Sequence, residues 1–123
     1  MSVGEEVPHD SAVTHVTGQS IFIDDRPEVQ GEVFVGIVTS SVAHGKIKKI
    51  DVQAALQHPD VLGIYRGRDF HKNVWGTIVE EQPLLADPIV SYMDEPILLI
   101  AVKDRLSLSV VRKLIKIEME EIP

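Results

Sequence analysis

Two short segments of the chain, residues 32–39 and 97–102, carry apolar side chains on both faces of a strand. A strand with one exposed face alternates apolar with polar residues, whereas a run that is apolar throughout is typical of a strand covered on both faces or of a helix segment. The shortness of these runs and their Val and Ile content favour strands. We therefore expect two central strands, each covered on both sides.

The length and composition of the chain are those of one ordinary globular domain. A chain of 123 residues fits a single domain of common size and can bury about two-thirds of its unfolded surface. Hydrophobic content of 44% and charged content of 25% are typical of a soluble folded protein rather than a disordered one.

Charge and cysteine content exclude several classes of function. The net charge of −7 opposes a phosphate backbone, so we expect no nucleic-acid partner. The absence of cysteine excludes disulfides and thiolate ligation of a metal or iron–sulfur cluster within this chain, and it fits a reducing compartment. No apolar run approaches the roughly 18 residues of a membrane span, and residues 1–10 lack the features of a secretory leader. We expect no membrane association and a cytoplasmic location.

Periodicity predicts an α+β, or mixed α/β, fold with five or six strands and two helices. The expected strands are residues 20–23, 32–40, 46–50, 60–66, 97–102 and 115–120. Ile47 and Ile50 are out of phase with strict alternation, which indicates a β-bulge. We interpret residues 1–30 as an extended N-terminal lead-in and residues 31–123 as a single domain.

Two helices are expected after Asp51 and Asp104, whose carboxylates can accept the free N–H groups of a first helical turn. The first helix begins at Val52 and ends at about Gln57, because Pro59 follows closely. The second carries apolar residues at i, i+4 and i+8, which we expect to face the core: Leu106, Val110 and Leu114.

Residues 67–88 form a long segment without clear periodicity, punctuated by glycine and proline. Loops of this length inside a compact domain are uncommon and are usually functional or held by a partner. Trp75 lies in this segment, where it is either a plug into a partner or a local core anchor.

A search for chemistry finds no self-contained active site. The five histidines, which form no HxH or HExxH motif, are His9, His15, His44, His58 and His71. His44 is the best exception to a surface role, although a hydrogen bond from its ring to the turn backbone is the favoured reading. Three acidic pairs are adjacent in sequence and point apart in a strand or turn: Asp24-Asp25, Glu80-Glu81 and Asp94-Glu95. We predict no catalytic, cofactor-binding or metal-binding residue in this chain.

A series of short segments nevertheless resembles one family in the family's own order. Residues 7–27 (VPHDSAVTHVTGQSIFIDDRP) are similar to the start of the large, molybdenum-binding subunit of xanthine dehydrogenase and aldehyde oxidase. The segments that continue the resemblance are residues 41–47, 50–55, 59–64, 69–76, 84–92, 96–102 and 117–123. Each segment is weak alone, but together they cover nearly the whole chain in one order.

This resemblance implies an α/β-hammerhead domain at the N-terminus of that subunit. Members of the family hydroxylate purines, aldehydes or N-heterocycles with a molybdenum–molybdopterin cofactor, and electrons pass through iron–sulfur clusters to FAD or another acceptor. The residues that hold the cofactor lie in later domains, so the resemblance implies a structural role with the catalytic molybdenum-binding domains as partners. A stand-alone interaction module derived from this domain, binding other proteins or itself, is the alternative.

One turn departs from the family pattern. The family usually has Gly-Gln-Pro before the last apolar strand, whereas this chain has Asp94-Glu95-Pro96. Glycine permits a positive φ that aspartate tolerates less easily. The departure therefore favours a different turn type, or drift in a domain without active-site duties.

Overall fold

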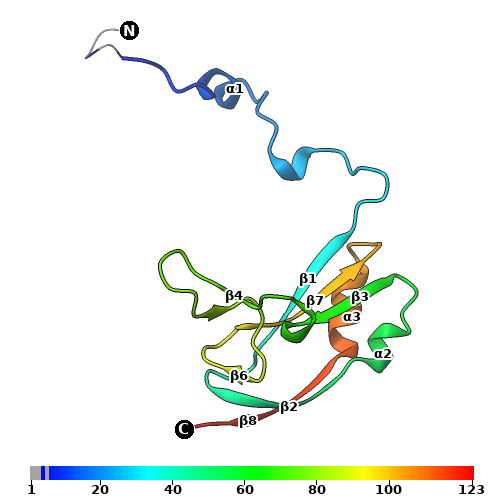
Figure 1. The fold of residues 1–123 in the computed structure, drawn as a ribbon. Helices are drawn as coiled ribbons and strands as arrows, with labels where there is room; N and C mark the ends of the chain where they lie inside the picture. The colour runs from blue at the N-terminus through cyan, green and yellow to red at the C-terminus, as the bar shows by residue number, and fades with distance from the viewer. Residues whose placement is uncertain (1–3, 5) are drawn as a thin grey trace. The chain divides into compact units, whose positions relative to one another are not determined.

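A computed structural model describes residue 4 and residues 6–123 of the chain. The chain divides into two compact units, Met1–Gly31 and Glu32–Pro123. Figure 1 traces the ribbon. No helix in the described part of the chain is long and apolar enough to cross a membrane.

The described residues of the first unit form helical turns rather than the expected strand. Helix α1 spans Ala12–Val16, and the 3₁₀ turn η1 spans Ile23–Asp25. The expected strand at residues 20–23 is wrong, because the Asp25 carboxylate accepts the Phe22 N–H (3.0 Å) and closes a local turn instead. Thr17 donates its hydroxyl hydrogen to the Val13 carbonyl (2.7 Å), a side-chain bond that competes with the helical ladder and fits the end of α1 at Val16.

The second unit is built around a three-stranded antiparallel sheet, sheet A, in the order β1-β7-β3. Strand β7 (Pro96–Val102) lies between β1 (Phe34–Thr39) and β3 (Val61–Arg66). Helices α2 (Gln53–Leu56) and α3 (Ser107–Leu114) pack on one side of this sheet, as Figure 1 shows. The core cluster between sheet and helices is centred on buried Ala55, Ile100, Val102 and Val111.

The two apolar runs have different environments. Strand β7 is the central strand that its sequence predicts, and Leu98, Ile100 and Val102 on its helix side are fully buried, whereas Leu99 and Ala101 on the other side are half-buried. Strand β1 is an edge strand, and the prediction that it is covered on both sides is wrong for the described residues. Its residues Val35 and Ile37 remain 61% and 42% exposed, because the helices cover only the opposite face.

A second antiparallel sheet, sheet B, has the order β6-β2-β8. Its strands are β6 (Ile89–Val90), β2 (Gly45–Asp51) and β8 (Lys116–Glu121). The register shifts between Ile47 and Lys49, which confirms the predicted bulge. Apolar residues of this sheet pack against a second core cluster of buried Ala86, Val90, Ile97 and Leu98.

Both expected helix-start aspartates accept backbone hydrogen bonds. Asp51 Oδ1 accepts the Gln53 N–H (3.0 Å), and Asp104 Oδ1 accepts the Leu106 N–H (2.9 Å). Each side chain bonds the N–H two residues ahead, so the regular helices begin slightly later than expected, at Gln53 and Ser107.

The predicted core stripe of the second helix is wrong at two of its three positions. Leu106 is 80% exposed and Val110 is 49% exposed, whereas Leu114 packs against the core. A second apolar row faces the core instead, with Val111 fully buried and Leu108 and Ile115 packed around it.

The long segment after β3 is partly ordered by short elements. It contains the 3₁₀ turn η2 (Gly67–Asp69) and a hairpin of β4 (Val74–Trp75) and β5 (Gln82–Pro83). Among the described residues the strands number eight, in three small sheets. The mixed α/β class is confirmed, and the five strands of six or seven residues are those that periodicity predicts. The three additional strands have two residues each.

Candidate functional site

The candidate site is the side of sheet A that faces away from α2 and α3, which we call the outer face. Strand alternation and register place two rows of residues on it. The register aligns Val35 and Gly63 with Ala101, and it aligns Ile37 and Tyr65 with Leu99. All six residues lack charge, so an apolar surface spans the three strands.

A cavity of about 250 Å³ lies on the outer face. Its lining is apolar and comes from three strands and the residue after η2: Val35, Tyr65, Phe70, Leu99, Ile100 and Ala101. Gly63 explains part of its shape, because a Cβ atom there would lie 2.6 Å from Tyr65 Oη. The missing side chain lets the Tyr65 ring lie back along the sheet.

Sheet B has the opposite character on its exposed side. The register pairs Lys46 with Glu120 and Lys49 with Glu118 across strands β2 and β8. Lys48, in the bulge, forms an ion pair with Glu120 and lowers the pKa of that carboxyl, first by hydrogen bonding and then by charge attraction. Opposite charges across neighbouring strands stabilise a sheet, so this side of sheet B is charged where the outer face of sheet A is apolar.

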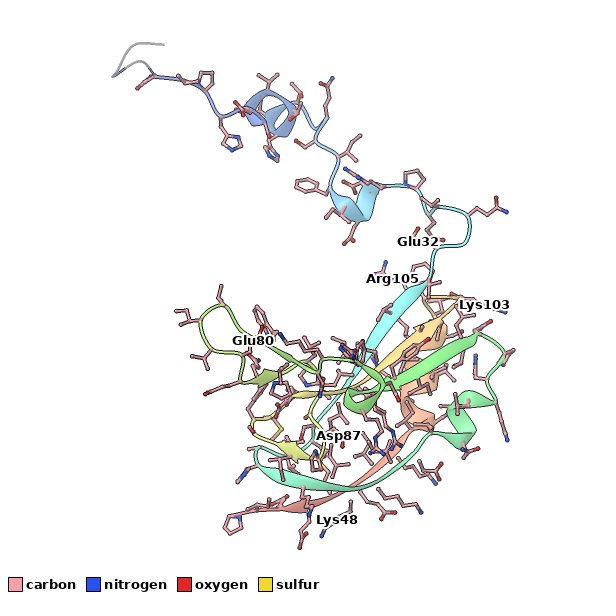
Figure 2. All side chains as sticks on the ribbon, viewed as in Figure 1. Glu32, Lys48, Glu80, Asp87, Lys103 and Arg105 are labelled. Atoms are coloured by element: carbon pink, nitrogen blue, oxygen red, sulfur yellow. The ribbon has the colours of Figure 1, made fainter. Side chains whose placement is uncertain are left out.

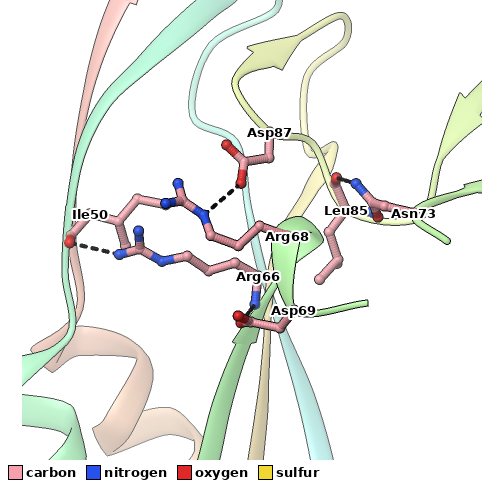
Figure 3. A network of polar contacts seen from close by, with 7 residues as sticks. All are labelled: Ile50, Arg66, Arg68, Asp69, Asn73, Leu85 and Asp87. Atoms are coloured by element: carbon pink, nitrogen blue, oxygen red, sulfur yellow. Dashed lines mark hydrogen bonds and ion pairs between the residues drawn. The ribbon is translucent and has the colours of Figure 1, made fainter. Parts of the chain in front are cut away.

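The long segment is held at its base by an amide clamp, seen in Figure 3. Asn73 Nδ2 donates to the Leu85 carbonyl (2.7 Å), and the Leu85 N–H donates to Asn73 Oδ1 (3.0 Å). Gly67 makes room for this clamp, because a Cβ atom there would lie 2.3 Å from Asn73 Nδ2.

Two arginines support the same region. Arg66 donates to the Ile50 carbonyl (2.9 Å), which ties β3 to sheet B. Arg68 Nε lies 3.2 Å from a carboxylate oxygen of Asp87, which ties η2 to the end of the segment (Figure 3). The base of the segment is therefore fixed by polar bonds.

The hairpin beyond this base carries exposed apolar side chains. Ile78 is 97% exposed and Trp75 is 55% exposed, and Val79 is also exposed. Trp75 is therefore not a local core anchor, and its alternative role as a plug into a partner stays a prediction. Leu85 and Ala86, at the end of the segment, are buried.

Three of the five histidines make short-range hydrogen bonds within their own segments. His15 Nδ1 lies 3.1 Å from Ser20 Oγ, while the Ser11 N–H donates to His9 Nδ1 (3.2 Å) and the Asp60 N–H donates to His58 Nδ1 (3.3 Å). His44 and His71 are exposed.

The hydrogen bond that the structure shows at His44 is made by its backbone. The His44 carbonyl accepts the Ile122 N–H (3.1 Å). In residue 4 and residues 6–123, no group of three or more His, Asp or Glu side chains comes together as a metal ligand set.

The acidic pairs also serve locally. Glu80, labelled in Figure 2, forms an ion pair with Lys72 across the hairpin, and Asp25 closes η1. Glu95 is buried, and its carboxylate accepts the Ser91 N–H (2.5 Å).

The turn before β7 has a positive φ at Asp94, a conformation that glycine adopts without strain. Asp94 has a φ of 63°. Among the described residues it is the one non-glycine residue with a positive φ. Its carboxylate accepts the Thr39 hydroxyl (3.1 Å), and its N–H donates to the Ser40 carbonyl (3.2 Å). Aspartate tolerates the left-handed region better than most residues, particularly with local hydrogen bonds.

Comparison with known proteins identifies close similarity over most of the chain. Residues 17–123 match the family described as "Aldehyde oxidase and xanthine dehydrogenase, a/b hammerhead domain". The xanthine dehydrogenase of Blastobotrys adeninivorans is 36% identical over 98% of this chain, and the nicotinate hydroxylase of Emericella nidulans is 30% identical over 98%. The chain spans only 9% of the length of each of these relatives.

Solved structures agree in fold. A Cu,Mo-CO dehydrogenase superimposes with a TM-score of 0.85 at 25% identity, covering 98% of this chain and 16% of its own. Quinoline 2-oxidoreductase from Pseudomonas putida 86 gives a TM-score of 0.82 at 26% identity, again over 98% of this chain and 16% of its own. The eight strands and few helices thus match a fold that occurs as a small part of much larger molybdenum-containing enzymes.

Proposed function

The chain belongs to the aldehyde oxidase and xanthine dehydrogenase family as its a/b hammerhead domain, and from this premise we propose that it is the N-terminal structural domain of a larger molybdenum hydroxylase. The family match over residues 17–123 is the observation that carries the proposal. The complete enzyme would act on purines, aldehydes or N-heterocycles.

The proposed role of this domain is to pack against the catalytic, molybdenum-binding domains of the same enzyme. The apolar outer face of sheet A and the exposed hairpin side chains around Trp75 support docking. Molybdenum–molybdopterin would supply the hydroxylation chemistry, with iron–sulfur clusters and FAD as electron carriers. The described residues of this chain assemble no ligand set that fits the metal, and we derive no reaction step from them.

Activity measurements on the isolated chain and on the enzyme that contains it test the proposal. We expect the purified 123-residue chain to bind no molybdopterin tightly and to show no hydroxylation of xanthine, benzaldehyde or nicotinate with a dye acceptor. The enzyme that contains this chain should hydroxylate at least one substrate of these classes. Turnover by the chain alone would contradict a purely structural role.

The alternative is a stand-alone interaction module, which the uncovered outer face also favours. Light scattering on the purified chain and sequencing of the gene beyond Pro123 separate the two proposals. A stop codon with no neighbouring gene for a molybdenum-binding subunit would favour the module. A monomer that captures no partner would argue against it.

We also propose a cytoplasmic location, which the absence of cysteine supports because a reducing compartment has no use for disulfides. Cell fractionation with an antibody against the chain tests this, and recovery in a membrane or exported fraction would contradict it.

A further inference from the structure

We infer that the cavity on the outer face of sheet A receives an apolar side chain from the molybdenum-binding domains of the same enzyme. This inference rests on the proposed function and specifies which surface docks. Its starting point is β1, where Val35 is 61% exposed although the strand carries apolar residues on both faces. Exposed apolar patches rimmed by polar residues mark interaction sites.

The cavity has the size and chemistry of an anchor site. Its volume of about 250 Å³ exceeds that of one large apolar side chain, and its lining is apolar throughout. Tyr65 and Phe70 contribute aromatic rings to the lining, and Ala101 contributes the smallest side chain of the lining. Buried aromatic or aliphatic anchors in such pockets carry much of the binding energy at protein interfaces. A charged or polar occupant would lose its hydration there without a hydrogen-bonding partner.

Charge and chain length point to the molybdenum-binding domains as the occupant. A second copy of this chain would bring two net charges of −7 together, which opposes self-association. The relatives carry this domain as 9% of a single polypeptide, so most of the chain of those enzymes is available to cover it. The charged side of sheet B offers no comparable apolar surface.

Two substitutions test the cavity in complementary ways. Ala101→Phe fills the cavity from within the domain, and Val35→Asp places a charge at its wall. Both residues belong to the outer face, so we expect the isolated chain to remain folded, which circular dichroism and thermal unfolding would verify.

Matched controls introduce the same side chains elsewhere. Lys49→Phe places the aromatic ring on the charged side of sheet B. Leu106→Asp places the charge at an exposed apolar position at the start of α3. Neither position belongs to the outer face.

The experiment co-expresses the tagged chain with the molybdenum-binding domains of its own enzyme and measures co-elution on gel filtration together with molybdenum content. We expect V35D and A101F to reduce co-elution at least tenfold, and K49F and L106D to behave like the wild type. Full co-elution of all four variants would overturn the inference and leave the proposed function intact.

Two other outcomes are decisive. If the wild-type chain fails to co-elute at all, both the inference and the proposed function fail. If the wild type instead forms a dimer that V35D disrupts, a second copy occupies the cavity and the inference is overturned in favour of a self-associating module.

Discussion

At the scale of single residues, Asp94 shows how a non-glycine side chain can hold a glycine-like turn. Its φ of 63° is strained for most residues, but its carboxylate accepts the Thr39 hydroxyl across the turn (3.1 Å). Strain in the left-handed region costs about 1–2 kcal/mol, and one hydrogen bond contributes about 1 kcal/mol. The two terms nearly offset each other.

We therefore expect Asp94→Gly to change the free energy of unfolding by less than about 1 kcal/mol, because relief of strain offsets the lost hydrogen bond. Asp94→Ala keeps the strain and loses the bond, so it should destabilise the domain by about 1–2 kcal/mol. Urea denaturation of both variants measures the difference. Equal stability of the alanine and wild-type chains would contradict this account of the turn.

A second prediction at the residue scale concerns Glu120. Lys48 holds the pKa of Glu120 below its ordinary value of 4.5, chiefly through their hydrogen bond. A lowered native pKa means that the pair stabilises the fold above pH 4.5 and that this contribution disappears as the pH falls through the native pKa.

NMR titration of the Glu120 carboxyl measures this shift directly. Lys48→Met should return the pKa toward its ordinary value, and added salt should have a weaker effect in the same direction because the pair is exposed. Lys103→Met is a suitable control, because Lys103 is not among the groups that shift Glu120. An unchanged Glu120 pKa in the Lys48 variant would show that the ion pair is absent in solution.

At the scale of elements, the clamp between Asn73 and Leu85 decides whether the hairpin is presented in one orientation. Asn73→Ala removes two hydrogen bonds to the Leu85 backbone (2.7 and 3.0 Å) and leaves those groups partly buried. We expect a loss of about 1–3 kcal/mol in unfolding free energy.

Hydrogen exchange measures the local effect, and the Leu85 amide should exchange much faster in this variant than in the wild type. Gly67→Ala should loosen the same contact, because its Cβ would lie 2.3 Å from Asn73 Nδ2. Lys72→Ala, which breaks only the exposed ion pair with Glu80, is the control and should change little. If the Leu85 amide of the Asn73 variant exchanged as slowly as that of the wild type, the proposed clamp would be contradicted.

Sequence periodicity predicts the elements of this fold better than it predicts their surroundings. The alternation in β8 and the bulge near Lys48 are visible in the sequence because side-chain period reports strand geometry directly. The exposure of Val35 cannot be predicted from the sequence. An apolar residue gives the same sequence pattern whether a helix of its own domain or another domain covers it.

The prediction of which face of α3 packs on the core is wrong for a related reason. The segment carries a second apolar row, Leu108, Val111 and Ile115, at i, i+3 and i+7, so periodicity alone does not show which row faces the core. Leu106 is exposed and Val111 is buried because this second row packs against the core cluster. The two strands of the hairpin have two residues each, which is too short for hydrophobic periodicity to reveal them.

The candidate site was also only partly predictable. Docking through residues 67–88 follows from the length of that segment, but the outer face of sheet A depends on register between three strands distant in sequence. Its signal in the sequence was the two-sided apolar pattern of residues 32–39. That pattern predicts a covered strand, and our proposal is that the molybdenum-binding domains cover it.

At the scale of the whole molecule, the unit Glu32–Pro123 contains all that its own core requires. Both hydrophobic clusters draw every member from this unit, beginning with Phe34 and ending with Met119. This supports our proposal that the N-terminal 30 residues are a lead-in rather than part of the folded core. Cooperative unfolding should therefore be a property of the second unit alone.

Deletion of residues 1–31 tests this division. We expect the shortened chain to unfold cooperatively, with a free energy of unfolding within about 1 kcal/mol of the full chain, because no member of either core cluster is removed. A longer deletion, of residues 1–40, also removes β1 with Phe34 and Val38 from the first cluster, and it should abolish cooperative unfolding. Urea denaturation followed by circular dichroism compares the three chains. If the shorter deletion already abolished the transition, the lead-in would have to be counted as part of the folded domain.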